Sequence, residues 1–349
     1  PADLKVDLSN GGFDGSLLVS PPCSLDESYK YVFLPVCYSL TFLFSLSLNS
    51  VVLVRSCRVR RRWTTSLTYM VNLASTDLMY GLSLPFLVHS YVLRDRWVFG
   101  DFMCRLVRFL FYFNLYCSIF FLTCISVHRY LGICHPMKTM SLESKRVVRI
   151  VCALVWLVVF ALTCPIFRFA QTGLLSRGQF PDPTPYLNCW DDAIDREFAD
   201  YVPYGVALHL LGFFVPFVII AWCYSQVLSR NKNNSVGFLS SVEDGMYSHY
   251  IRRRRKSIKT IVTITLLFAL CFLPFHVTRT LFLLLKRAQT GGCGVFKAVS
   301  ICYKVTRPLA SCNAWLNALL YFLTGDKGAP AAGKSEVHVE ESKSSRIIF

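Results

Sequence analysis

The chain has 349 residues, 54% of them hydrophobic, and a formal net charge of +16 at pH 7. Its basic residues fall between long apolar runs that a soluble domain of this size could not bury, which excludes a soluble nucleic-acid-binding protein despite the charge. We therefore interpret the chain as an integral membrane protein.

Seven apolar stretches follow one another along the chain, and each is long enough to cross about 30 Å of hydrocarbon. In chain order they are Tyr31–Val54, Thr65–Val92, Cys104–Gly132, Val147–Phe167, Tyr201–Leu228, Ile258–Leu285 and Phe296–Leu323. The sequence predicts an all-α membrane protein, a bundle of seven transmembrane helices over residues 31–323. An N-terminal tail (1–30) and a C-terminal tail (324–349) flank it.

Lys and Arg gather in alternate connecting segments. Arg55–Trp63 carries five arginines and no acid, and the segment before the sixth stretch ends in the basic cluster Arg252–Lys256. The N-terminal tail instead has five acids against two lysines. Because positively charged loops stay in the cytoplasm, we predict an extracellular N-terminus, a cytoplasmic C-terminus and a multi-pass plasma-membrane location. Lys286, Arg287 and Lys297 are exceptions, since this topology places them outside.

Four of the fifteen cysteines fall at the outer face on this topology: Cys23, Cys104, Cys189 and Cys293. An even number of cysteines in an oxidising compartment indicates two disulfides. Three pairings are open, and the spacing does not choose between them.

Ionisable side chains inside membrane spans cost about 2.5–3.5 kcal/mol each on insertion scales, so they indicate a functional site. Basic residues are in excess toward the predicted outer side of three spans: Arg108, His276, Arg279, Lys304 and Arg307. His276 and Arg279 are three residues apart, as are Lys304 and Arg307, so each pair shares a helix face.

The four cations among these basic residues, Arg108, Arg279, Lys304 and Arg307, would repel one another unless an anion lay between them. Arg matches phosphate oxygens bidentately and Lys adds a point charge. Aromatic residues near them in sequence offer stacking surface for a flat ring: Phe111, Tyr112, Tyr116 and Phe275. The pattern predicts a site for a phosphate-bearing ring compound. The alternative is that the cations snorkel to lipid headgroups, which the two same-face pairs disfavour.

Motifs along the whole membrane domain resemble those of the rhodopsin class of G-protein-coupled receptors. They are Asn49, Asn72–Leu78, Trp97, Cys104, His128-Arg129-Tyr130, Trp156, Pro216 and Tyr224. The resemblance implies that G-protein coupling and activation involve His128, Arg129, Tyr130, Pro274, Asn317 and Tyr321. It also implies a sodium site at Asp77, Asn313 and Asn317, with a hydrogen-bonded network without metal as the alternative.

Two stretches narrow the resemblance. Phe268–Thr280 and Tyr303–Ser311 are similar to the sixth and seventh helices of the metabotropic purinoceptors, the receptors for extracellular nucleotides, and to their uridine-nucleotide branch in particular. The resemblance implies that the five basic residues line a phosphate pocket and that Cys104 pairs with Cys189 and Cys23 with Cys293. It further implies that Asp191 pairs with pocket arginines as a lid.

The resemblance predicts a cell-surface receptor for UTP, UDP or ATP that acts through a heterotrimeric G protein, phospholipase C and calcium. No cofactor and no nucleic acid are expected as partners. Ser335, Ser342, Ser344 and Ser345 are candidate phosphorylation sites in the tail, which makes arrestin a candidate partner; a solvated tail is the alternative.

One position departs from the family pattern Asp/Asn-Pro-x-x-Tyr in the seventh helix. The chain has Asn317-Ala318-Leu319-Leu320-Tyr321. Because Pro removes a helix hydrogen bond and kinks the helix, we expect Ala318 to give a straighter seventh helix. Signalling would then be weakened, or its basal level altered, while binding survives.

Other functions have weaker support in the sequence. The same fold could bind another anion, such as a carboxylate metabolite or an acidic lipid, or act as a silent decoy. An anion transporter is disfavoured because the hydropathy pattern shows no inverted repeat. An enzyme is not expected: the P-loop-like string Gly328–Ser335 lacks the strand and domain that the mechanism needs.

Overall fold

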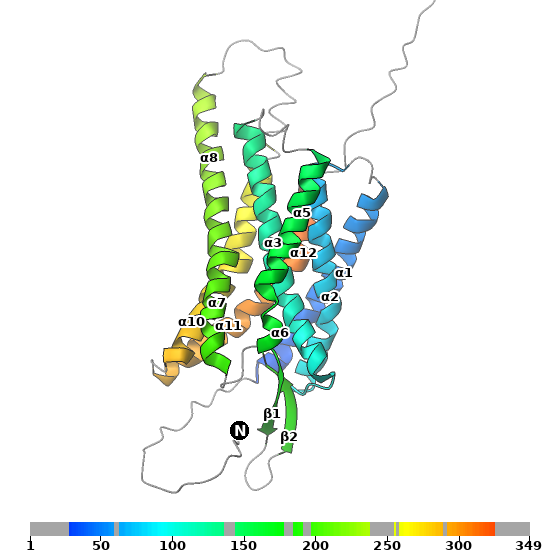
Figure 1. Cartoon of the computed structure of the whole chain (residues 1–349), viewed down its shortest axis with the longest axis vertical. Helices are drawn as coiled ribbons and strands as arrows, with labels where there is room; N and C mark the ends of the chain where they lie inside the picture. Colours follow the sequence, from blue (N-terminus) through cyan, green and yellow to red (C-terminus); the bar gives the residue numbers. More distant parts are fainter. Residues whose placement is uncertain are drawn as a thin grey trace, which may run out of the picture.

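A computed structural model of the chain shows a bundle of seven helical spans with a two-stranded sheet projecting from one end (Figure 1). It describes residues 28–58, 63–135, 144–177, 184–190, 197–237, 255, 258–288 and 292–324. The first three spans are α1 (Lys30–Arg58), α2 (Thr65–Val92) and α3 (Gly100–Cys134), and the fourth is α5 (Lys145–Thr163) with the short α6 (Ile166–Phe169).

The last three spans each contain an irregularity. The fifth consists of α7 (Phe198–His209), a π-helical turn η3 (Leu210–Phe214) and α8 (Val215–Gly237). The sixth starts by Ile258 and passes through a second π-helical turn, η4 (Phe268–Phe272), into α10 (Leu273–Ala288). The seventh consists of α11 (Cys293–Ser311) and α12 (Asn313–Thr324).

The predicted spans are confirmed. Five described helices are long and apolar enough to cross a membrane, and α2 and the α11–α12 pair complete the bundle. Large apolar side chains face outward, including Leu157, Val218 and Leu270, each more than 60% exposed. Helix starts follow the sequence: Thr64 Oγ1 accepts from the Leu67 amide at the start of α2, and Ser144 Oγ accepts from the Val147 amide at the start of α5.

α3 lies at the centre of the bundle, since 72% of its apolar segment is buried, against 28% for α1. Buried polar groups link it to its neighbours. Asn114 Nδ2 donates to Asp77 Oδ1 on α2 at 2.7 Å, and Asn317 Nδ2 on α12 donates to Asp77 Oδ2 at 3.1 Å. The helices therefore share a buried polar centre around Asp77.

The seventh span differs in part from expectation. α12 runs unbroken through the buried Ala318, as Ala in place of Pro predicts. The span as a whole is nevertheless interrupted at Cys312, a single turn residue between α11 and α12.

Several sequence-based predictions lie outside the described residues. They concern Cys23, Asp191, Arg252–Arg254, Lys256, Gly328–Ser335 and the tail serines Ser335, Ser342, Ser344 and Ser345.

Candidate functional site

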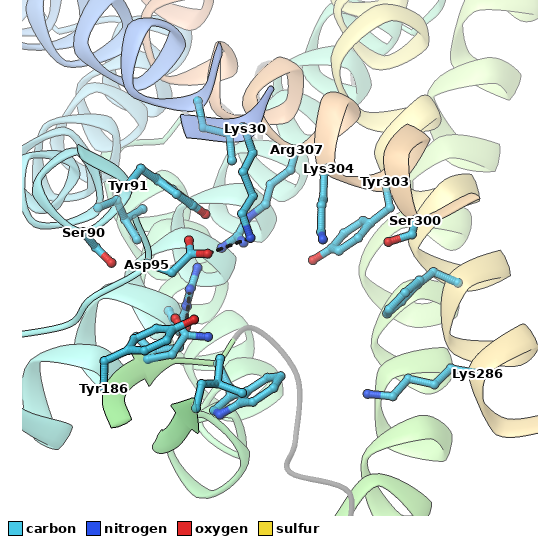
Figure 2. Close-up of a pocket in the computed structure, with 18 residues that line it drawn as sticks. Lys30, Ser90, Tyr91, Asp95, Tyr186, Lys286, Ser300, Tyr303, Lys304 and Arg307 are labelled. Carbon is cyan, nitrogen blue, oxygen red and sulfur yellow. Dashed lines mark hydrogen bonds and ion pairs between the residues drawn. The ribbon is translucent and has the colours of Figure 1, made fainter. Parts of the chain in front are cut away.

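A cavity of about 390 Å³ opens at the sheet-bearing end of the bundle, between α1, α2, α3, α10, α11 and the hairpin (Figure 2). Its apolar wall includes Leu34, Leu87 and Phe282. The charged side chains on its wall are Lys30, Asp95, Arg108, Lys286, Lys304 and Arg307. Among the described lining residues, five carry a positive charge and Asp95 alone carries a negative one, so the cavity has a positive potential.

Arg108 enters the cavity from α3 and is tied to the hairpin. Its Nη2 donates to the Cys189 carbonyl at 2.8 Å, and its side chain is buried. One turn earlier, Cys104 forms a disulfide with Cys189, with a Cα–Cα distance of 5.6 Å. The pairing Cys104–Cys189 is therefore confirmed. Cys293 is also disulfide-bonded, but Cys23, its expected partner, lies outside the described residues.

Lys304 and Arg307 reach the cavity from one face of α11, as their spacing predicted (Figure 2). Arg307 is only 5% exposed, and its guanidinium carbon lies 5.0 Å from the centre of the Phe111 ring. Phe111 thus supports Arg307 by a cation–π contact from α3 rather than lining the cavity itself.

The hairpin of β1 (Thr172–Arg177) and β2 (Thr184–Cys189) closes one side of the cavity. Leu175 and Tyr186 are register partners and both line the cavity, whereas Leu174, on the opposite face, is 73% exposed. Asp101 at the start of α3 holds the hairpin, because its Oδ1 accepts from the Thr172 amide at 2.8 Å.

Arg279 lies behind the cavity wall. It is 1% exposed, and its Nη2 donates to the Tyr201 hydroxyl at 2.8 Å. Its guanidinium carbon lies 4.6 Å from the ring centre of Tyr303 and 5.8 Å from that of Phe282. Those two rings are stacked with centres 5.3 Å apart, and both line the cavity.

His276 is deeper still and fully buried. Its Nδ1 lies 2.8 Å from the Phe272 carbonyl, and its ring stacks on Phe213 with centres 4.1 Å apart. Phe275, Tyr112 and Tyr116 are buried as well and do not line the cavity in the described part of the chain. Of the five predicted basic residues, the structure therefore brings Arg108, Lys304 and Arg307 to the cavity and leaves Arg279 and His276 behind its wall.

Three charged lining residues were not predicted as site residues from the sequence: Lys30, Asp95 and Lys286. Lys30 and Asp95 lie at the ends of membrane spans, where charges are ordinary. The position of Lys286 could have indicated a role in the site, because it is one of the lysines that the predicted topology places outside, against the charge rule for loops. Its Nζ lies 4.3 Å from the centre of the Phe198 ring.

The opposite end of the bundle holds several of the predicted coupling residues. The Tyr130 hydroxyl lies 3.2 Å from His135 Nε2, and its ring packs on Trp222 with centres 5.0 Å apart. His128 and Arg129 precede it on the last turns of α3, and Tyr321 is buried in α12. Pro274 is the second residue of α10, one residue beyond the end of the π-helical turn η4.

The residues around Asp77 fit a sodium ion in their chemistry. Asp77 is fully buried and accepts from Asn114, Ser118 and Asn317. The amide oxygens of Asn313 and Asn317 are buried and have no hydrogen-bond partner among the described residues. Hard cations prefer such carboxylate and amide oxygens, so Asp77 and Asn317, which are in contact, fit a cation in their chemistry.

Comparison with known proteins agrees with this architecture. Residues 48–321 match the 7 transmembrane receptor (rhodopsin family). The turkey protein named purinoceptor 3, of the metabotropic series, is 38% identical over 308 residues, 87% of this chain and 88% of the relative. Human purinoceptor 4 of the same series is 41% identical over 90% of this chain and 80% of its own length. Human purinoceptor 2 of that series is 41% identical over 92% and 80% respectively.

Proposed function

The chain belongs to the rhodopsin family of seven-transmembrane receptors and, within it, to the metabotropic purinoceptors, and we propose that it is a receptor for UTP, UDP or ATP. Members of this family are multi-pass signalling receptors of the plasma membrane rather than enzymes. We infer further that the sheet-bearing end faces the cell exterior, with the apolar outer surface of the bundle in contact with the bilayer.

One observation carries the proposal: Arg108, Lys304 and Arg307 converge on one cavity with a single described carboxylate. The volume of about 390 Å³ lies within the range of small-molecule sites. Arg108 and Arg307 offer planar forks for phosphate oxygens, and Lys304 adds a point charge between the helices. The stacked rings of Phe282 and Tyr303 offer a flat surface for the base or ribose.

Arg279 and His276 have a different part in this proposal from the one that the sequence indicated. Arg279 supports the aromatic wall and adds positive potential from behind it. His276 packs between the fifth and sixth spans, where it contacts Phe213. Both would reach phosphate directly only after the sixth span moved. Asp191 lies outside the described residues and keeps in this proposal the role that the resemblance implies, a lid that pairs with pocket arginines.

Signalling follows from contraction of the cavity around an anion. Phosphates held by α3 and α11 draw these helices together, and the sixth span moves about Pro274, which lies just beyond its π-helical turn. The movement opens a cleft near Arg129 at the other end for a heterotrimeric G protein. We propose that this G protein activates phospholipase C and raises cytosolic calcium.

The test is calcium mobilisation in receptor-null cells with UTP, UDP, ATP, ADP and a panel of carboxylate metabolites. A nucleotide response that Arg307→Gln weakens at least about tenfold supports the proposal. Arg287→Gln is the matched control, since Arg287 is exposed near the end of α10 and does not line the cavity. A response to carboxylates alone would assign the cavity to another anion.

A further inference from the structure

An ion pair joins α1 to the turn between α2 and α3 at the wall of the cavity. Lys30 Nζ lies 2.7 Å from Asp95 Oδ2, and the Tyr31 hydroxyl donates to the same oxygen at 2.9 Å. The two charged side chains are only 13% and 12% exposed. Because both are shielded from water, each depends strongly on the charge of its partner.

The backbone that presents Asp95 is unusual. Arg94 and Asp95 have φ angles of 55° and 71°, in the left-handed region that residues with a side chain rarely adopt. The Asp95 amide donates to the Ser90 carbonyl at 2.9 Å, which returns the chain over the end of α2. Such conformations cluster at ligand clamps and switches. Here the turn brings the carboxylate to Lys30 on the cavity wall.

Both partners face the same space as the phosphate-binding candidates. Figure 2 shows Lys30, Lys304 and Arg307 with their charged ends toward the cavity, and the Lys30–Asp95 pair beside them. An anion in this cavity is attracted by Lys30 and repelled by Asp95. The interaction energy between Lys30 and Asp95 therefore changes when an anion binds in the cavity.

We propose that Lys30 and Asp95 form an exchangeable ion pair that sets the preference of the receptor for the length of the phosphate chain. This inference rests on the proposed nucleotide site. Without ligand, Asp95 neutralises Lys30. When a nucleotide binds, its terminal phosphate becomes the partner of Lys30, while Arg108, Lys304 and Arg307 hold the remaining phosphate charge.

Charge matching explains why the Lys30–Asp95 pair would discriminate between nucleotides with two and three phosphates. A nucleoside diphosphate carries about three negative charges near neutral pH, and a triphosphate about four. Arg108, Lys304 and Arg307 match the diphosphate, whereas Lys286 is held against the Phe198 ring. The additional charge of a triphosphate is matched by Lys30, so Lys30 contributes more to triphosphate binding than to diphosphate binding.

The first test replaces Lys30 and measures calcium responses to UTP and UDP, with ATP and ADP in parallel. Lys30→Gln should raise the half-maximal concentration of the triphosphate about tenfold and that of the diphosphate less than about threefold. Lys30→Arg keeps the charge and should preserve the ratio between the two nucleotides. Surface labelling corrects each response for receptor number.

The second test separates exchange from a purely structural role of Asp95. Asp95→Asn keeps the side-chain size, tolerates the left-handed backbone and still accepts from the Tyr31 hydroxyl. In the unliganded receptor the substitution removes the negative charge that pairs with Lys30. In the liganded receptor a phosphate already takes that place, so only the unliganded state loses the ion pair. We expect the half-maximal UTP concentration to fall about threefold or more. If the role of Asp95 were purely structural, the half-maximal UTP concentration would rise instead.

The double variant and a control complete the design. In the Lys30→Gln background the gain from Asp95→Asn should disappear, because the two residues are coupled. Asp200→Asn is the control, since Asp200 is 71% exposed and does not line the cavity. It should leave both nucleotides unchanged.

The outcomes are distinguishable. An equal rise for UTP and UDP in Lys30→Gln, or weaker responses in Asp95→Asn at normal surface level, overturns the exchange and leaves the nucleotide receptor standing. A wild-type receptor that responds to no nucleotide overturns the proposed function itself. If Asp95→Asn does not reach the surface, the UTP-to-UDP ratios of Lys30→Gln and Lys30→Arg decide the question.

Discussion

The guanidinium carbon of Arg279 lies 4.6 Å from the centre of the Tyr303 ring, and that ring forms part of the cavity wall which Arg279 itself does not reach. Arg279 is thus a buried charge one aromatic ring away from the site of the proposed phosphates. In a low-dielectric environment such a charge still raises the potential of the cavity. It also fixes the ring by a cation–π contact.

Arg279→Ala should raise the half-maximal nucleotide concentration at least about tenfold, equivalent to about 1.4 kcal/mol. The variant removes the buried charge and leaves a void behind Tyr303, so the wall loses its support. Arg279→Lys separates the effect of the charge from that of the guanidinium contacts. The variant should retain most of the potency if the positive charge matters most, and little if the contacts of the planar guanidinium group matter most. The measurement is a calcium dose–response at matched surface level. An unchanged response in Arg279→Ala would exclude any role for this residue in binding.

Gly212→Ala should destabilise the receptor, because a Cβ at this position in the π-helical turn η3 would lie 2.5 Å from the Tyr116 ring. Overpacking of this kind costs about 1–3 kcal/mol, and we expect the melting temperature in detergent to fall by about 3 °C or more. Gly132→Ala on α3 is the control, since nothing lies within 4 Å of its Cβ. It should leave the melting temperature unchanged or raise it slightly. Equal melting temperatures for the two variants would contradict the close approach.

Asp77→Asn should abolish any dependence of nucleotide potency on sodium. The variant keeps the side-chain size but removes the charge that Asn114, Ser118 and Asn317 surround. A ligand that binds one receptor state better shifts the potency of a second ligand, so exchanging sodium for choline should change wild-type potency about threefold. A wild-type receptor insensitive to sodium indicates the hydrogen-bonded network alone. Equal sensitivity in the variant places sodium elsewhere.

The fold was largely predictable because apolar length is a local property of the sequence. Every predicted span overlaps a helical span of the structure, and the three-residue spacing of Lys304 and Arg307 correctly placed both on one side of α11. The disulfide Cys104–Cys189 came from the resemblance, not from spacing. The π-helical turns had no sequence signal that we recognised.

The composition of the cavity wall was less predictable, since it depends on how each helix is rotated in the bundle. His276 and Arg279 share a face by spacing, but spacing does not say whether that face meets the cavity or a neighbouring helix. The structure turns it toward the fifth span, where Arg279 meets Tyr201. Lys30 and Asp95 are 65 residues apart and meet only through the packing of α1 on the α2–α3 turn.

Ala318→Pro should be tolerated and should increase the maximal calcium response. Proline at this position removes the amide hydrogen that would bond to the Ala314 carbonyl. That carbonyl already accepts from Asn49 Nδ2 at 2.6 Å, so it keeps a partner when the helix bond is lost. A kink placed here gives α12 a hinge for the inward movement that activation requires.

Leu319→Pro is the matched control. It would leave the Trp315 carbonyl without its helix hydrogen bond, and no described side chain donates to that carbonyl in its place. We expect this variant to reach the cell surface poorly, whereas Ala318→Pro should reach it at the wild-type level. Surface labelling and nucleotide dose–response curves give both quantities. If Ala318→Pro is retained inside the cell like the control, Asn49 does not compensate for the lost hydrogen bond. If Ala318→Pro reaches the surface but signals no better than wild type, Ala318 does not limit signalling. The break at Cys312 then supplies the flexibility that the seventh span needs.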